Sequence, residues 1–460
     1  MRSYNWQQIP RLMVTKSGRR RLTTSILHRL KRIIIPLSNF YRKYLIRHVK
    51  IVTVIGSFGK TTTTRATAVA LGLSLEKFQG KNVGVFLAAG LLSIPPWARF
   101  HVMEVGISKK GQMEKNAALI HPDIAVVTCI GSEHGTTLGG LSQTREEKAL
   151  MVRALPESGL AVLNGDDPHV RKMKSYTKAR VVTYGYGPSN DLQANYIKTD
   201  LSNGTQFSFN YGNEYYEIST KLFGKASTYS LMSAFIVARE FKISPDLVLK
   251  RLSALKPMHH RLEIINTISG VNLLVDTFKS AFETVEHALD TFEALQAKRK
   301  IIILGEVEEL PDSIGNIYRA IGARVAETAT CLIFIGTKRV KGPLFGEVRR
   351  AGMKEENLLF AKNSISRAKE MALEIVEPGD LVLIKGRSSQ KMERIAIALM
   401  GKPVSCNLEF CNQKTRCNDC LNLNREPTDS FNDKVAYGYI KNTKSEKKNK
   451  DINANSGWLT

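Results

Sequence analysis

The chain has 460 residues, of which 67 are basic and 42 acidic, so its formal net charge is +25. Apolar residues make up 43% and charged residues 24%, a balance that excludes an intrinsically disordered chain. No apolar run approaches the roughly 18 residues of a membrane-spanning helix, and six cysteines are too few for a disulfide scaffold of this length. We therefore expect a soluble, basic protein of several domains.

The excess positive charge is concentrated at the N-terminus. Residues 1–50 contain 13 Lys or Arg and no Asp or Glu, which is more than half of the net charge. A strongly basic chain is typical of nucleic-acid binding, but here the charge belongs to a basic arm on a mildly basic body. Nucleic acid is therefore not the expected partner.

The arm has the pattern of an amphipathic helix. Between Thr23 and Lys50, apolar residues recur every three or four positions, with basic residues between them and Pro36 predicted to kink the helix. The apolar positions are Ile26, Leu30, Ile33, Leu37, Tyr41 and Tyr44. Such a helix binds an anionic membrane surface or an acidic carrier. The alternatives are a helix packed on the body with solvated basic side chains, and an organelle transit peptide.

From Ile51 onward, short β-branched runs alternate with helical stretches, which predicts a doubly wound parallel sheet. Polar alternating stretches within 190–222 predict antiparallel hairpins, and helices are expected between Thr228 and Lys256. Four more apolar runs after residue 260 predict a second, Rossmann-like α/β domain. The expected divisions are an arm (1–50), a central domain (51–257), a C-terminal α/β domain (258–401), a cysteine segment (402–424) and a disordered polar tail (425–460).

The sequence Gly56-Ser57-Phe58-Gly59-Lys60-Thr61-Thr62 stands between a predicted buried strand and a helix. In that position glycines let backbone N–H groups surround phosphates, a lysine reaches the β- and γ-phosphates, and a hydroxyl coordinates Mg²⁺. We therefore expect a P-loop ATPase-type sheet that binds ATP and Mg²⁺. The nucleotide would contact Gly56, Ser57, Gly59, Lys60, Thr61 and Thr62.

The loop resembles that of the Mur ligase family, G-T/S-x-G-K-T-T/S, whose members are ATP-dependent amide-forming enzymes of cell-wall synthesis. Three further segments stand in family order: MEVG (103–106), TCIGSEH (128–134) and GLAVLNGDD (159–167). The resemblance implies that Glu104 and His134 are catalytic residues that hold Mg²⁺. It also implies that Lys148 is carbamylated by CO₂ and offers oxygen ligands to a second Mg²⁺. Without the resemblance, Lys148 could equally be a solvated surface lysine.

The C-terminal half carries the same resemblance. HRLE implies a catalytic Arg261 at the domain junction, and VDTFKSAFETVEHAL implies a catalytic Asp276 near the hinge and a nucleotide contact from Lys279. ILGEVEEL and GDLVLIKGRSSQKME are similar to the D-alanyl-D-alanine-adding branch, and the second implies that Lys385 contacts the nucleotide.

The resemblance implies that a small carboxylate and an amine, such as an amino acid or dipeptide, are joined through an acyl phosphate, with release of ADP and phosphate. Lys60 and Mg²⁺ would neutralise the charge as two anions approach. One alternative is a ligase that adds D-alanyl-D-alanine to a UDP-muramyl peptide. Another is an ATP-binding regulatory or scaffold protein that has lost ligation. We expect a cytoplasmic protein, held at the inner face of the membrane if the arm binds lipid.

The chain departs from the family pattern in several places. A basic arm stands where family members carry a UDP-binding domain, so a UDP-linked substrate is not the first expectation. Cys129 replaces an asparagine, and residues 224–230, GKASTYS, replace the G-x-H-N-x-x-N segment.

A cysteine cluster is also foreign to the family. Its members Cys406, Cys411, Cys417 and Cys420 have the spacing C-x4-C-x5-C-x2-C, which suits a tetrahedral Zn²⁺ site. Reduced thiols and an iron–sulfur cluster are the alternatives.

Overall fold

The computed structural model describes residues 16–74, 82–133, 138–409, 411, 415–420 and 422–424. The predicted tail, 425–460, lies outside this part of the chain. The chain divides into two compact units. Unit 1 comprises Met1–Glu263, Ala281–Gln296 and Glu308–Ser313, and unit 2 comprises Ile264–Ser280, Ala297–Val307 and Ile314–Thr460.

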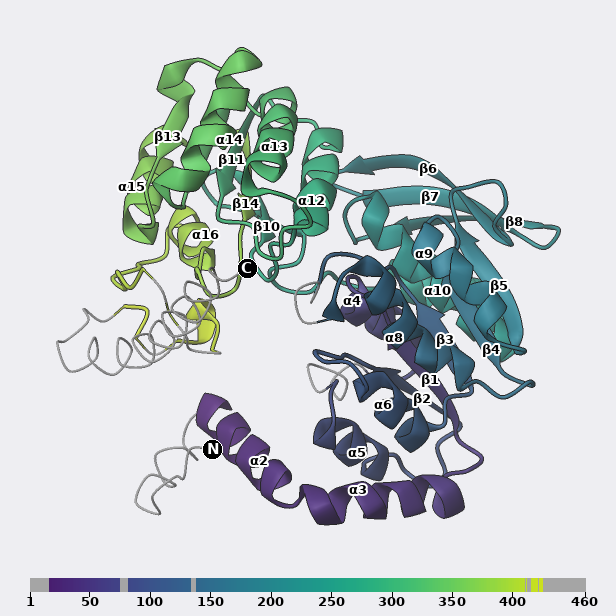
Figure 1. The fold of residues 1–460 in the computed structure, drawn as a ribbon. Helices are drawn as coiled ribbons and strands as arrows, with labels where there is room; N and C mark the ends of the chain where they lie inside the picture. The colour runs from purple at the N-terminus through teal and green to yellow at the C-terminus, as the bar shows by residue number, and fades with distance from the viewer. Residues whose placement is uncertain are drawn as a thin grey trace, which may run out of the picture. The chain divides into compact units, whose positions relative to one another are not determined.

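Unit 1 is built on an eight-stranded sheet (Figure 1). Its strands are β1 (Lys50–Ile55), β2 (Phe100–Glu104), β3 (Ile124–Val127), β4 (Leu160–Asn164), β5 (Arg180–Gly185), β6 (Leu192–Asp200), β7 (Gly204–Tyr211) and β8 (Glu214–Thr220). The order is β2-β1-β3-β4-β5-β6-β7-β8. Neighbours from β2 to β6 pair in parallel, while β6–β7 and β7–β8 are antiparallel, as predicted.

Helices cover both faces of this sheet. On one face Val52 and Val54 of β1 share a buried cluster with α4 (Lys60–Ala70), α10 (Lys225–Glu240) and α11 (Pro245–Ser253). On the other face Ile51 and Ile55 pack with α5 (Val85–Leu92), α6 (Gln112–Ile120), α8 (Leu141–Arg153), α9 (Pro168–Arg171) and η4 (Lys172–Tyr176). Helix α12 (Phe282–Ala294) also belongs to unit 1. Because successive strand side chains point to opposite faces, the β-branched run of β1 fills both cores.

Unit 2 contains a six-stranded sheet, which confirms the predicted second α/β domain. Its strands are β9 (Glu263–Asn266), β10 (Asn272–Asp276), β11 (Arg299–Leu304), β12 (Cys331–Phe334), β13 (Leu358–Phe360) and β14 (Asp380–Lys385), in the order β13-β12-β11-β14-β10-β9. The helices are α13 (Ile314–Thr328), α14 (Lys338–Arg350), η5 (Glu355–Asn357), α15 (Ile365–Ile375), α16 (Glu393–Leu399) and η6 (Cys417–Asp419).

The N-terminal arm forms α2 (Lys16–Arg29), α3 (Lys31–Phe40) and a π-helical turn, η2 (Tyr41–Leu45). The predicted split of the helix does not fall at Pro36: the chain bends at Leu30, between α2 and α3, and Pro36 lies inside α3. Helix α3 begins at Lys31, five residues before Pro36. The proline has no backbone N–H, so α3 lacks one hydrogen bond near its beginning. None of the helices in the described part of the chain combines the length and apolar content needed to cross a bilayer.

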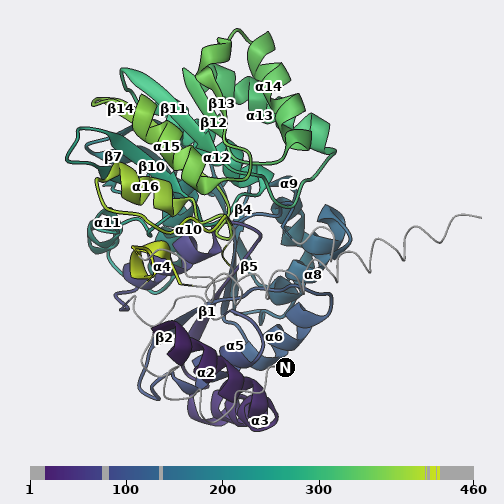
Figure 2. The ribbon, with the colours of Figure 1, turned by 90° about the vertical axis from the view of Figure 1, so that its left-hand side faces the viewer.

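The arm is joined to unit 1 by a buried arginine. Helix α3 lies along α5 in both views (Figures 1 and 2). Just beyond it, the Arg42 guanidinium, 5% exposed, donates to four backbone carbonyls at 2.7–3.1 Å and pairs with Asp123 Oδ2 at 3.3 Å. The carbonyls are those of Ile46, Val49, Ile120 and His121. Burial lowers the pKa of Arg42, and the Asp123 charge opposes that shift.

We predict that Arg42→Met destabilises the protein by about 3 kcal/mol or more, because four backbone carbonyls, most of them buried, lose a donor together and Asp123 loses its arginine partner. The measurement is the free energy of unfolding in denaturant. Arg32→Met, at an exposed position of α3, is the matched control and should change stability by less than about 0.5 kcal/mol. Equal stabilities for the two variants would contradict the role of Arg42.

Candidate functional site

The candidate phosphate loop joins β1 to the N-terminus of α4. Gly59 precedes the helix with φ +77°, and Gly56 has φ +140°, both values that favour glycine. A Cβ on Gly56 would lie 1.9 Å from Thr128 Oγ1. Glycine is therefore needed at residue 56 both for its backbone conformation and for the close approach of the chain that follows β3.

The segment after β3 holds the loop in place. The Ser57 N–H donates to Cys129 O at 2.7 Å, and Thr128 Oγ1 donates to Phe58 O at 2.6 Å. Ser57 Oγ accepts the Gly131 N–H at 2.9 Å. Cys129, at the family's asparagine position, thus contacts the loop through its backbone oxygen, so that contact does not depend on the replaced side chain.

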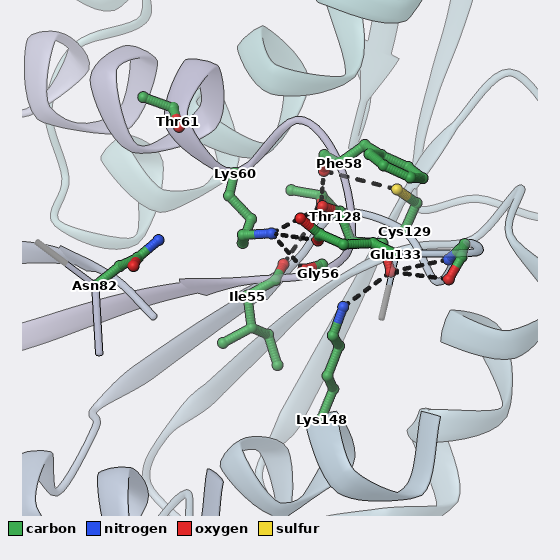
Figure 3. A network of polar contacts seen from close by, with 12 residues as sticks. Ile55, Gly56, Phe58, Lys60, Thr61, Asn82, Thr128, Cys129, Glu133 and Lys148 are labelled. Atoms are coloured by element: carbon green, nitrogen blue, oxygen red, sulfur yellow. Dashed lines mark hydrogen bonds and ion pairs between the residues drawn. The ribbon is translucent and has the colours of Figure 1, made fainter. Parts of the chain in front are cut away.

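Lys60 is folded back over its own loop (Figure 3). Its Nζ donates to Gly56 O and Ser57 O, both at 2.8 Å, and forms an ion pair with Glu133 Oε2 at 3.0 Å. Both members of the pair are buried. Burial lowers the pKa of Lys60, partly offset by nearby carboxylates, of which Glu104 is the strongest. The loop therefore holds a desolvated cation, and a bound phosphate could replace Glu133 as its ion-pair partner.

Lys148 is a second buried lysine at the same loop. It lies on α8, is 2% exposed, and its Nζ donates to Ser57 Oγ at 2.8 Å (Figure 3). The surface-lysine alternative is therefore wrong. Burial lowers the pKa of Lys148 well below its ordinary value, and the positive charge of Lys60 lowers it further. The neutral amine, which is the nucleophilic form, is thus favoured.

Glu104 and Thr61 supply oxygen atoms near Lys60. Glu104 ends β2, next to β1 in the sheet, and its Oε1 accepts from Asn82 Nδ2 at 2.8 Å. Its Oε2 is buried and finds no hydrogen-bond partner among the described residues. Thr61 Oγ1 is 3.5 Å from an Arg261 guanidinium nitrogen. An orphaned carboxylate oxygen and a hydroxyl are donors of the kind that Mg²⁺ prefers, so these residues fit that ion.

The predicted residues of unit 2 form a separate group at the carboxyl ends of two paired strands. Asp276 of β10 stands opposite Lys385 of β14, and their side chains form an ion pair at 2.9 Å. Lys385 is fully buried and also donates to Lys279 O. Lys385 is therefore not an ordinary surface charge, while nucleotide contacts by Lys385 and Lys279 stay predictions.

Two site predictions receive no support from the geometry. His134 lies outside the described residues. Among the residues that the structure does describe, no three metal-ligating side chains come together, so zinc at the cysteines stays a prediction. Cys406 Sγ instead lies 3.5 Å from Arg394, and Cys417 is buried beside Glu393, where burial raises the pKa of its thiol.

Glu133 and Glu283 are site residues that the sequence analysis missed. Glu133 is the counter-charge of Lys60, and Glu283 of α12 accepts from Ser132 N at 2.6 Å and from Ser132 Oγ at 2.7 Å. The signal for Glu133 was its place directly before His134 in the TCIGSEH segment. Glu283 lies in the VDTFKSAFETVEHAL segment, but nothing in its spacing indicates a contact 151 residues away.

Comparisons with known proteins identify the family of the chain. The Mur ligase middle domain matches residues 54–238, and the Mur ligase, glutamate ligase domain matches residues 260–388. The chain is 28% identical over 366 residues to the UDP-N-acetylmuramoyl-tripeptide–D-alanyl-D-alanine ligase of Bacillus subtilis (strain 168), covering 77% of each chain.

Solved structures share the fold at lower identity. MurF from Acinetobacter baumannii superposes with a TM-score of 0.71 at 18% identity, over 81% of each chain. MurF ligase from Thermotoga maritima in complex with ADP gives a TM-score of 0.69 at 18% identity, over 81% of this chain and 84% of that one. With both of the family's domains matched in order, the chain belongs to the Mur ligase family.

Proposed function

We propose that the protein is an ATP-dependent ligase that joins a carboxylate to an amine as an amide and releases ADP and phosphate. The observation that carries the proposal is that two buried lysines, Lys60 and Lys148, both bond to the same phosphate loop at Ser57. The desolvated Lys60 cation is costly, and a bound triphosphate is the anion that would offset that cost at this loop. The family membership supports the same reaction.

In the proposed reaction the γ-phosphoryl group passes from ATP to a carboxylate oxygen, which gives ADP and an acyl phosphate. The amine nitrogen then attacks the acyl carbon, the bond from that carbon to the phosphate oxygen breaks, and the nitrogen loses a proton. Lys60 would leave Glu133 for the phosphates and hold them through the transfer. The backbone N–H groups of the loop would orient the same oxygens.

Thr61 Oγ1 and the Glu104 carboxylate would hold Mg²⁺ beside the phosphates. When bound, the ion neutralises the charge on the nucleotide and the incoming carboxylate. Arg261, whose guanidinium lies near Thr61, adds fixed positive charge at the same end of α4.

The similarity to the Bacillus subtilis ligase supports an amino acid or dipeptide as the amine, and D-alanyl-D-alanine with a UDP-muramyl tripeptide is the first pair to test. A scaffold that had lost ligation would have no need to keep Lys148 buried against the loop. Burying an amine without a compensating function is destabilising, so its retention favours an active enzyme.

We propose that CO₂ carbamylates Lys148, as the resemblance to the family implies. The carbamate nitrogen forms from the neutral amine, which the buried position favours. The product is an anion next to the Lys60 ammonium, so the two groups would attract each other. Its oxygens would offer the hard ligands that a second Mg²⁺ needs.

We also propose a cytoplasmic enzyme whose basic arm holds it at an anionic surface. The arm is fixed to unit 1 through Arg42, so whatever the arm binds is kept beside the domain that carries the phosphate loop.

We predict that Lys60→Ala lowers ADP release with UDP-N-acetylmuramoyl-tripeptide and D-alanyl-D-alanine by about 100-fold or more, because one donor to transferring charge is lost. Lys109→Ala, at an exposed lysine of the same unit, should keep full activity. If the wild type binds ATP but forms no amide with this pair or with a panel of other acids and amines, the scaffold alternative replaces the ligase.

We predict that wild-type protein in ¹³C-labelled bicarbonate shows a carbamate carbon signal that Lys148→Ala lacks. The alanine variant should lose activity, and acetate should restore part of it by placing a carboxylate in the vacated space. Lys109→Ala should retain the signal. A spectrum of Lys148→Ala with an unchanged carbamate signal would exclude this lysine as the modified residue.

We predict a pH signature for Lys148 in CO₂-free buffer. Its pKa is lowered in the folded state, so between that value and its ordinary value the unfolded chain binds the extra proton and stability rises with pH. Lys148→Met should remove this contribution, up to about 1.4 kcal/mol per pH unit. The measurement is the free energy of unfolding from pH 7 upward, and an unchanged slope in Lys148→Met would show that the buried amine does not titrate as described.

A further inference from the structure

The N-terminal arm carries a second apolar face that unit 1 does not cover. One side of α3 and η2 packs on unit 1 through Ile34 and Tyr41, and the Tyr41 hydroxyl donates to Ile94 O at 2.6 Å. Apolar side chains on the other side are largely exposed. We call this second side the arm face, and it consists of Ile26 (47% exposed), Leu30 (44%), Ile33 (65%), Leu37 (52%), Phe40 (55%) and Tyr44 (62%).

The spacing of the arm face shows that it is one surface. From Leu30 to Tyr44 its residues follow at intervals of three and four, which puts them on one side of a helix. Phe40 and Tyr44 are in ring contact, with centroids 4.8 Å apart. Six neighbouring apolar side chains at about half exposure are more than the scattered surface hydrophobics of an ordinary protein, and such a patch marks a binding surface.

An exposed tryptophan lies in a loop that contacts the arm. Trp97 is 82% exposed and follows two prolines in the loop after α5. The loop is held against the arm, because His48 Nε2 is 2.6 Å from Pro96 O and Tyr41 bonds to Ile94 O. Tryptophan and tyrosine are the side chains that favour the boundary between lipid and water, since each has a large apolar ring and a polar group.

Positive charge accompanies the arm face. Arg29, Lys31, Arg32, Lys43 and Arg47 are all exposed, and residues 1–50 contain no acidic side chain. The Lys43 ammonium lies 5.3 Å from the Tyr44 ring centroid. A partner that matches the arm face must therefore present both apolar groups and negative charge.

We propose that the arm face and Trp97 bind the surface of a lipid bilayer that contains anionic lipids. Helices α2 and α3 have 14 and 10 residues, too short to span a bilayer, so they would lie in its plane with the apolar side chains at the acyl boundary and the basic ones among the headgroups. A second copy of the chain fits less well, because a symmetric contact would set one acid-free basic face against another. Nucleic acid matches the charge but not the apolar row.

Bilayer binding uses none of the residues of the phosphate site, so it is independent of the proposed reaction. The ligase could be active in solution while the arm fails to bind lipid, and the converse holds as well. Each proposal can therefore fail without the other.

The test is co-sedimentation of the full chain with vesicles of phosphatidylcholine alone and of phosphatidylcholine containing about one third phosphatidylglycerol. We expect binding to the anionic vesicles, weak binding to the neutral ones, and release at high salt. The triple variant Ile33→Ser, Leu37→Ser, Phe40→Ser should lower the affinity about tenfold or more through lost apolar burial. Ile268→Ser, at an exposed apolar residue of unit 2, is the matched control and should bind like the wild type.

A fluorescence measurement tests the orientation. The chain has three tryptophans, so replacing Trp6 and Trp458 by Phe leaves Trp97 as the reporter. Its emission should shift to the blue with anionic vesicles. Equal sedimentation with both vesicle types, unchanged binding of a folded triple variant, or a dimer that the triple variant abolishes without vesicle binding would each overturn the proposal.

Discussion

The site depends on the placement of two lysine side chains against a single buried loop. Lys60 and Lys148 come from different helices and both bond to Ser57, where burial and the positive charge of Lys60 lower the pKa of Lys148. The Glu133 carboxylate pairs with Lys60, and the burial of Lys148 favours its neutral amine. The two amines therefore lie in different electrostatic surroundings at the same loop, and Lys60 is the one positioned to meet an anion.

The parallel sheet explains why these groups meet. β1 lies between β2 and β3, so the phosphate loop, Glu104 and the segment from Thr128 to Glu133 all leave the sheet at the same edge. Gly56 lets β1 approach Thr128 closely enough for the two chain segments to share hydrogen bonds. The strand order of the sheet therefore determines which residues surround the loop.

Sequence patterns predicted the fold and the loop well, since both depend on local spacing. The β-branched run before Gly56 and the glycine–lysine–threonine turn can be recognised from neighbouring residues alone, without knowing what they contact in the fold. Glu133 could not be predicted because its partner, Lys60, lies 73 residues away in the sequence. The burial of Lys148 could not be predicted either, because the charged run Glu146-Glu147-Lys148 is typical of a solvated helix face. The spacing alone does not predict which residues form the arm face. Tyr41 shares the spacing of the exposed residues, yet its hydroxyl donates to Ile94 O. The break between α2 and α3 falls at Leu30, where the sequence has no helix breaker, while Pro36 is accommodated inside α3.

The central claim is that Lys60 is the phosphate-binding lysine and that Glu133 holds its charge until the nucleotide arrives. A crystal structure with Mg²⁺ and a non-hydrolysable ATP analogue tests it most directly. Lys60 Nζ is expected to leave Glu133 and to lie within hydrogen-bond distance, about 3 Å, of a phosphate oxygen. A bound nucleotide with Lys60 still paired to Glu133, or a nucleotide seated away from the loop, would contradict it.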